Sequence, residues 1–165
     1  MILWAHGLEG SPEGTKVRLL RAAGFDLVAP DGRDLPLADR LDGLLAESAR
    51  LASQRPVLAG SSYGGLACAW LAAQHPERFR GVLLLAPALQ WSEPPVADAG
   101  ALIAPPGLRV IVIHGTGDLV VPLRTSRSYV DRSGPDATMQ EVEDGHPLIG
   151  SMPVIEAALH TLLGL

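Results

Sequence analysis

Short runs of almost purely apolar residues recur along the chain and constrain its fold more than any other feature. Val82–Ala86 has no polar side chain, and Leu108–Ile113 has one. Strands without polar alternation are buried on both faces, which is typical of a parallel sheet with helices on either side. The other expected strands are Met1–Ala5, Phe25–Ala29, Pro56–Ala59 and Thr138–Val142. We therefore expect an α/β fold with a six-stranded, mostly parallel sheet and helices on both faces.

The stretches between these runs predict helices, because their apolar residues recur at helical spacing. A first helix is expected after Met1–Ala5, with Ser11 as its N-cap, Pro12 at its first position and Gly24 ending it. The later helices are expected at Leu37–Ser53, Leu66–Gln74, Thr125–Val130 and Pro153–Leu163. Strands and helices thus alternate along the chain, as in a doubly covered sheet.

The length of 165 residues suits one domain spanning the whole chain, 1–165. One long stretch has no strand or helix pattern, Leu89–Gly107, and it contains four prolines. A connection of this length inside a compact domain is usually functional or mobile. We expect this proline-rich loop, 89–107, to border the functional site.

The charge balance argues against several kinds of partner. Thirteen Lys and Arg face eighteen Asp and Glu, giving a net charge of −5 and no basic cluster. We therefore expect no nucleic acid and no membrane surface as partner. The first residues have no basic leader, no apolar run is long enough to span a bilayer, and the single cysteine allows no internal disulfide. A cytoplasmic location is the expectation, and nothing in the sequence indicates an oligomeric state.

The segment Gly60-Ser61-Ser62-Tyr63-Gly64 carries the clearest chemical signal, because it matches G-x-S-x-G between a strand and a helix. In this nucleophile elbow a sharp turn exposes the central hydroxyl above the sheet, and the flanking glycines allow strand and helix to pass closely. The frame selects Ser62, since Ala59 stands where Ser61 would need a glycine. The alternative interpretation is a glycine-rich turn between strand and helix that binds a phosphate or has no role beyond turning the chain.

A serine hydroxyl needs a base to become a nucleophile, and the base needs an acid to orient it. His146 follows the sixth strand, where it would reach the carboxyl ends of the strands. Asp118 follows the fifth strand through a glycine-containing turn, and Asp98 in the long loop is the alternative acid. We expect Ser62, Asp118 and His146 to form a catalytic triad.

The remaining polar residues are expected to have structural or supporting roles. Structural roles are expected for His6, His75, His114 and His160, a turn or capping role for Asp144, and burial as a small apolar residue for Cys68. An oxyanion hole needs two backbone N–H groups, and those of Tyr63 and Leu8 are the expected donors. Glu9 and Lys16 would line the entrance or be solvated charges. No metal or cofactor is expected, since no residues are clustered at metal-ligand spacing.

With these residues in view, the chain resembles the α/β-hydrolase superfamily. Four segments match its pattern in chain order: His6-Gly7, Gly60–Gly64, Gly115–Pro122 and Gly145-His146. The segment from His6 to Lys16 looks like that of small capless serine esterases and the dienelactone-hydrolase-like group. Typical dienelactone hydrolases have a cysteine nucleophile, whereas this chain has Ser62.

The resemblance implies a minimal α/β-hydrolase fold. The cap domain and the two N-terminal strands of larger relatives would be lacking, and the loop 89–107 would stand in place of the cap. The strands beginning near Phe25 and Thr138 would form the two edges of the sheet.

The predicted function is a serine hydrolase, carboxylesterase- or thioesterase-like, that cleaves small acyl esters or thioesters through an acyl-enzyme on Ser62. Trp91, Val96, Leu102 and Ile103 are the large apolar residues of the loop 89–107 that would shelter a short acyl group. Trp91 and Glu9 are the expected substrate-binding residues. The alternative is a non-catalytic, partner-binding protein on the same scaffold.

Overall fold

The computed structural model describes all residues, 1–165, and contains one six-stranded sheet in the order β2-β1-β3-β4-β5-β6. The strands are β1 Ile2–Ala5, β2 Leu27–Val28, β3 Val57–Ser61, β4 Gly81–Leu85, β5 Val110–Gly115 and β6 Ala137–Val142. All five neighbouring pairs are parallel, so the sheet is parallel throughout rather than mostly so. The edge strands are β2 and β6, as the family resemblance implied.

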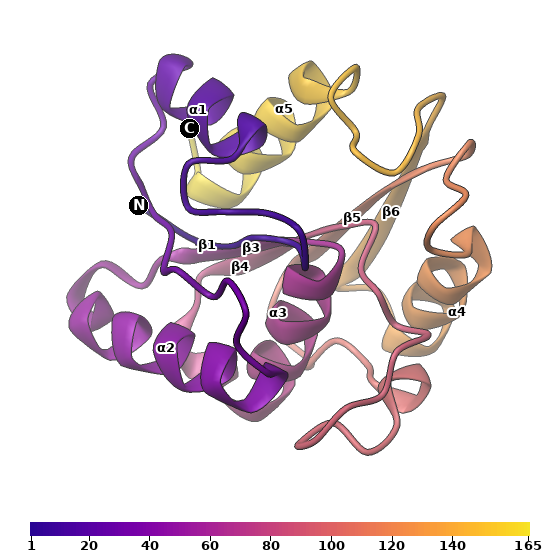
Figure 1. Cartoon of the computed structure of the whole chain (residues 1–165), viewed down its shortest axis with the longest axis horizontal. Coiled ribbons are helices and arrows are strands. Elements are labelled where there is room, and N and C mark those ends of the chain that lie inside the picture. The colour runs from indigo at the N-terminus through magenta and orange to yellow at the C-terminus, as the bar shows by residue number, and fades with distance from the viewer.

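Five helices cover the two faces of the sheet, as expected for the α/β-hydrolase fold. They are α1 Thr15–Ala22, α2 Leu37–Arg50, α3 Tyr63–Gln74, α4 Leu123–Ser133 and α5 Met152–Leu163. Figure 1 shows α1 and α5 on one face and α2, α3 and α4 on the other. No inserted cap covers the sheet, and none of the helices has the length and apolar composition that crossing a membrane requires.

The strands supply side chains to two separate cores, one on each face. In β4, Val82 and Leu84 pack toward α2, α3 and α4, whereas Leu83 and Leu85 pack toward α1 and α5. All four side chains are fully buried. Successive side chains of a strand point to opposite faces, so a strand between two helical layers must be apolar at every position. This explains why the central strands show no polar alternation.

The edge strand β2 is shorter than the sequence predicts. Only Leu27 and Val28 pair with β1, although Phe25–Ala29 has strand composition. The N–H of Phe25 is instead used to close α1, donating to the carbonyl of Leu20 at 3.0 Å. Pro30 follows directly and has no N–H to extend the ladder.

The start of α1 also differs from the prediction. Ser11 is not its N-cap; the helix begins at Thr15, with Gly14 as the N-cap residue. The N–H of Gly14 donates to the carbonyl of Ser11 at 3.1 Å, so these residues form a separate turn before the helix. Gly24 ends the segment as predicted, with a φ of 90° that favours glycine.

The proline-rich loop 89–107 packs mainly on the core beside α2, α3 and α4. Val96 is buried there and Leu102 packs against the same core, whereas Ile103 is exposed. Arg132 of α4 donates to the carbonyls of Gly100 and Leu102 and so holds the loop against that helix. The expectation that Val96, Leu102 and Ile103 shelter an acyl group is therefore wrong. Their side chains are used in packing or face solvent away from the site.

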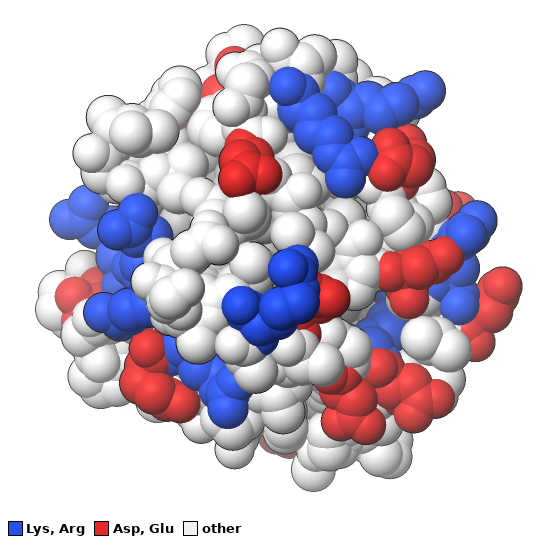
Figure 2. Space-filling view, turned by 90° about the vertical axis from the view of Figure 1, so that its left-hand side faces the viewer, with Lys and Arg blue, Asp and Glu red and all other residues white.

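Charged side chains are mixed on the surface that Figure 2 shows. Patches of basic and acidic side chains are interspersed over this face, without a large area of one sign. Several of the chain's charged side chains form ion pairs. Arg21 and Glu13 approach to 2.7 Å, and Arg33 and Asp31 to 2.6 Å. Exposed pairs of this kind contribute little to stability, because water screens both charges.

Candidate active site

The turn between β3 and α3 holds Ser62 in an unfavourable backbone conformation, with φ 57° and ψ −116°. Strain of this kind costs on the order of 1–3 kcal/mol and persists only where the surroundings fix it. A Cβ on Gly60 would lie 2.5 Å from the carbonyl oxygen of Gly64, and a Cβ on Gly64 would lie 2.1 Å from that of Ala5. Both positions therefore require glycine, as the sequence pattern predicts.

The three residues of the expected triad come together above the sheet. The Nε2 of His146 lies 3.0 Å from the Oγ of Ser62, and its Nδ1 lies 2.7 Å from Oδ2 of Asp118. The carboxylate accepts from Nδ1–H, which leaves Nε2 free to accept the Ser62 proton. Ser62 comes from the β3–α3 turn, Asp118 from the loop after β5 and His146 from the loop after β6.

Asp118 is the most heavily hydrogen-bonded member of this group, and its side chain is fully buried. Its Oδ1 accepts the N–H groups of Val120 and Val121 at 2.8 and 2.9 Å. Burial acts to raise the pKa of Asp118, but the bonds from His146 and from these N–H groups outweigh it and hold the pKa below its ordinary value. The carboxylate is therefore ionised at neutral pH.

A second histidine also contacts Asp118. The Nε2 of His114, at the end of β5, lies 3.2 Å from Oδ2 of Asp118 and 3.1 Å from the carbonyl oxygen of Val121. Both are acceptors, so Nε2 carries the proton and Nδ1 accepts from the Ser126 hydroxyl at 2.8 Å. Burial lowers the pKa of His114, which has no exposed surface. A structural role for His114 remains the interpretation, but no local pattern in the sequence indicated its contact with Asp118.

Two backbone N–H groups border the cavity without a protein acceptor. That of Leu8 belongs to the loop after β1 and that of Tyr63 to the first residue of α3, and both residues line the cavity above Ser62. The carbonyl of Gly7 accepts from the Nδ1 of His6 at 2.8 Å and from Arg40 at 3.4 Å. Because C=O and N–H of a trans peptide point in opposite directions, holding the Gly7 carbonyl also fixes the direction of the Leu8 N–H.

His6 and Arg40 hold this loop in place through hydrogen bonds to its backbone. The Nε2 of His6 accepts the N–H of Gly32 at 3.0 Å, so the proton of the neutral ring lies on Nδ1. Burial lowers the pKa of His6 and favours this neutral form. Arg40 also donates to the His6 carbonyl at 3.1 Å, and its guanidinium lies 4.7 Å from the ring centre of Tyr63. The ring of Tyr63 therefore packs away from the cavity, against Arg40.

Glu93 also belongs to this polar cluster and accepts hydrogen bonds from two helices, α2 and α3. The hydroxyl of Tyr63 donates to its carboxylate at 2.7 Å, and the N–H of Leu37, at the start of α2, donates at 3.0 Å. Burial and the Glu93 carboxylate raise the pKa of Tyr63 to about 12. The sequence analysis did not find Arg40 or Glu93. Arg40 had a signal, since it lies on the apolar stripe of α2 between Leu37 and Leu44.

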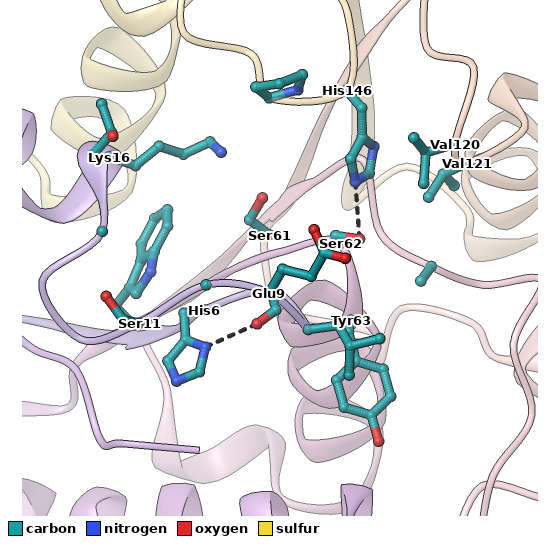
Figure 3. Close-up of a pocket in the computed structure, with 18 of the residues that line it drawn as sticks. His6, Glu9, Ser11, Lys16, Ser61, Ser62, Tyr63, Val120, Val121 and His146 are labelled. Carbon is teal, nitrogen blue, oxygen red and sulfur yellow. Dashed lines mark hydrogen bonds between the residues drawn. The ribbon is translucent and has the colours of Figure 1, made fainter. Parts of the chain in front are cut away.

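A cavity of about 720 Å³ opens above Ser62 and is lined by the expected site residues Leu8, Glu9, Tyr63, Trp91 and His146. Figure 3 shows His146 directed at Ser62 across this space. Trp91 is half-exposed, and its ring N–H donates to Glu93 at 3.2 Å. Of the loop 89–107, only Gln90 and Trp91 line the cavity. The volume lies in the range typical of small-molecule sites.

The other sequence candidates lie outside this constellation. Asp98 is exposed and makes no contact with His146. Asp144 accepts from the N–H of Gly145 and the hydroxyl of Ser151, which is a turn role as expected. Cys68 is fully buried, and burial raises the pKa of its thiol. No group of three or more His, Cys, Asp or Glu side chains is arranged to hold a metal.

Comparisons with known proteins add a family and several solved structures. The sequence model of a family described as "Putative esterase" matches residues 34–135, more than half of the chain, including Ser62 and Asp118. No curated protein sequence matches the chain.

Among solved structures, a "putative hydrolase of the alpha/beta superfamily" from Xanthomonas campestris is 25% identical, with a TM-score of 0.77 over 99% of this chain and 97% of that one. A structure of the metagenome-derived lipolytic enzymes LipS and LipT is 20% identical, with a TM-score of 0.81, covering 99% and 93%. The monoacylglycerol lipase of Paleococcus ferrophilus is 18% identical, with a TM-score of 0.80 and the same coverage. At such identities the last two likenesses show the shared fold.

Proposed function

The chain belongs to this esterase family within the α/β-hydrolase superfamily, and we propose that it cleaves small acyl esters or thioesters through an acyl-enzyme on Ser62. One observation carries the proposal. A continuous hydrogen-bonded path runs from the Ser62 hydroxyl through His146 to Asp118, and it opens onto the cavity at Ser62. A nucleophile, its base and an orienting acid are the groups that acyl transfer needs.

In the first half of the reaction, Ser62 Oγ attacks the ester carbonyl while His146 Nε2 takes the hydroxyl proton. The oxygen–carbon bond forms and the carbonyl oxygen becomes an oxyanion. The intermediate collapses, the bond to the alcohol oxygen breaks, and His146 gives its proton to that oxygen. In the second half a water molecule repeats the sequence on the acyl-enzyme, releasing the acid and restoring the Ser62 hydroxyl.

Asp118 and two N–H groups have supporting roles in this scheme. The buried Asp118 carboxylate keeps the His146 proton on Nδ1 and stabilises the imidazolium that forms when Nε2 accepts the second proton. The N–H groups of Leu8 and Tyr63 would donate to the oxyanion, since both line the cavity beside Ser62 without another protein acceptor. Arg40 would hold both donors, because it bonds the Gly7 carbonyl and packs on the Tyr63 ring.

The small acyl group in this proposal is supported by the walls of the cavity. No cap covers it, and the loop 89–107 contributes only Gln90 and Trp91. Each buried methylene contributes about 0.8 kcal/mol to binding. A site that buries only the first few methylenes stops gaining kcat/KM beyond them, and we expect the optimum at roughly two to six carbons.

The test combines labelling with turnover. A fluorophosphonate probe should label the wild-type chain and leave the Ser62→Ala variant unlabelled, with Ser61→Ala as the matched control that still reacts. Wild-type chain should hydrolyse acetyl and butyryl esters faster than dodecanoyl esters. If the folded wild-type chain neither reacts with the probe nor hydrolyses any ester or thioester, the non-catalytic, partner-binding alternative holds instead.

A further inference from the structure

Lys16 is the only lysine in the chain, and all other basic side chains are arginines. It lies in the first turn of α1 and lines the same cavity as Ser62 and His146. Figure 3 shows its side chain extended into the cavity, with the nitrogen toward Ser61 and His146. A full positive charge is thus placed in the proposed substrate site.

This ammonium group lacks the acidic partner that several exposed arginines have. Arg21, Arg33 and Arg127 each pair with a carboxylate within 2.7 Å. Lys16 is half-buried, with no carboxylate within 4.0 Å and no hydrogen bond to the protein. An unpaired cation in a partly buried position is stabilised when an anion binds beside it.

Two carboxylates face the same region, and neither forms a close ion pair with Lys16. Asp144 is the acidic group that acts on it through space, but both its oxygens already accept hydrogen bonds from Gly145 and Ser151. Glu9 lines the cavity and is exposed to solvent. Burial lowers the pKa of Lys16, and Asp144 only partly offsets this effect, so a nearby anion would favour the charged form.

We infer that Lys16 binds an anionic group of the substrate, so that the site prefers esters that carry a carboxylate a few atoms from the ester bond. This inference rests on the proposed function, because it concerns the substrate class of the same site. The cavity holds one ammonium group beside the Ser62–His146 pair, which suits a single carboxylate. A neutral ester would leave the Lys16 ammonium group unpaired, and an ester that carries a positive charge would be repelled by it.

The first test compares matched pairs of alkyl esters by proton release. Monoethyl succinate and ethyl butyrate share a four-carbon acyl chain, whereas acetoxyacetate and ethyl acetate share an acetyl group. For the anionic member of at least one pair, Lys16→Met should raise KM by roughly 10- to 100-fold with kcat changed less than about threefold. Both neutral esters should keep their KM. The pair that responds tells whether the carboxylate lies on the acyl or the alcohol side.

Two further variants separate charge from structure. Lys16→Arg should retain most of the preference for the anionic ester, because the charge remains. Arg18→Met removes an exposed cation of the same helix that does not line the cavity, and it should change KM for the anionic ester by less than about twofold. If Lys16→Met and Arg18→Met have equal effects, or neither has any, Lys16 is a solvated charge and the inference is wrong.

The second test needs no turnover and so separates this inference from the proposed function. Reductive methylation with ¹³C-formaldehyde labels only Lys16 and the N-terminal amine, and it keeps the charge. In the Ser62→Ala variant, monoethyl succinate should move the methyl resonance of Lys16 saturably, whereas ethyl butyrate should not. The N-terminal resonance is the internal control. If esters are hydrolysed but this resonance stays fixed at saturating substrate, the anion subsite is refuted while the hydrolase proposal stands.

Discussion

Two serine–histidine pairs converge on the same carboxylate, and they differ mainly in their access to the cavity. His146 joins Asp118 to Ser62, with its two ring nitrogens at 2.7 and 3.0 Å from them. His114 joins Asp118 to Ser126, at 3.2 and 2.8 Å. The residue types are the same in both, but the ring nitrogens are exchanged: Asp118 meets Nδ1 of His146 and Nε2 of His114.

The surroundings of the two pairs are opposite. His114 and Ser126 are fully buried, and neither lines the cavity. His146 is partly exposed and Ser62 lies at the cavity with a strained backbone. A serine–histidine–aspartate connection is only a structural network unless a substrate can reach the hydroxyl and an oxyanion site lies beside it.

Removing each serine in turn tests whether access to the cavity distinguishes the two pairs. Ser62→Ala should lower kcat for ester hydrolysis by about 10⁴- to 10⁶-fold, because serine and base act as a unit. Ser126→Ala should lower it by less than about tenfold. Steady-state kinetics on butyryl esters, with thermal unfolding as the control for folding, measures both. Comparable losses in the two variants would mean that access does not distinguish the pairs.

The shared carboxylate should show the next largest effect. Asp118→Asn should lower kcat by about 10³- to 10⁴-fold, since an amide can favour the wrong tautomer of His146. Asp98→Asn is the matched control and should behave like wild type, because Asp98 is exposed and does not line the cavity. Loss of activity in Asp98→Asn with an active Asp118→Asn would show that the acid has been wrongly identified.

Replacing the buried histidine should affect stability more than chemistry. His114→Leu removes one of the donors to Asp118 and leaves the Ser126 hydroxyl without its acceptor. We expect the free energy of unfolding to fall by about 1–3 kcal/mol, and kcat by less than about tenfold. Denaturant titration and ester kinetics on the same preparation separate the two. A kcat loss as large as that of Asp118→Asn would make His114 part of the chemistry.

Acid should destabilise the fold through the buried histidines. The native pKa values of His114 and His6 are lowered by burial, so the unfolded chain binds more protons below its ordinary histidine pKa of about 6.5. The free energy of unfolding should therefore be highest above this pH and fall as pH drops below it. Between roughly pH 6.5 and 5 the fall should be smaller in His114→Leu. An unchanged slope in that variant would mean that His114 is protonated in the native state.

The smallest expected effect concerns access to Ser62 itself. Trp91 is the one large apolar residue of the loop 89–107 at the cavity, and Trp91→Ala should raise KM by a few-fold for butyryl esters and less for acetyl esters. Ile103→Ala, in the same loop but exposed away from the cavity, is the control and should leave both KM values unchanged. A steady gain in kcat/KM out to long acyl chains would contradict the short-chain prediction.

Much of the architecture could be predicted because it depends on local patterns. Apolar runs and helical spacing predicted the six strands and the covered sheet, and the spacing of Gly60, Ser62 and Gly64 predicted the turn that the structure contains. Chain order also predicted that Ser62, Asp118 and His146 would meet, although their catalytic roles stay a prediction until the variants are measured.

The predictions were wrong where tertiary packing, and not the local sequence, determines the conformation. Ser11 looked like an N-cap, but the turn it forms with Gly14 delays α1. Val96 and Leu102 looked like walls of a substrate site, but α4 holds their loop on the core instead. Composition alone could not distinguish an apolar residue that lines a cavity from one that fills a core.

Local sequence patterns are enough to predict the layered α/β fold and the order in which the site residues follow the strands, because those depend on residue periodicity and on turns only a few residues long. Three features became visible only in the folded chain: His114 shares Asp118 with His146, Arg40 holds the loop at Leu8, and the single lysine points into the cavity. These features bring together segments that are far apart along the chain. Contacts such as Ser62 with His146, 84 residues apart, depend on how whole elements pack, and no local pattern records that packing.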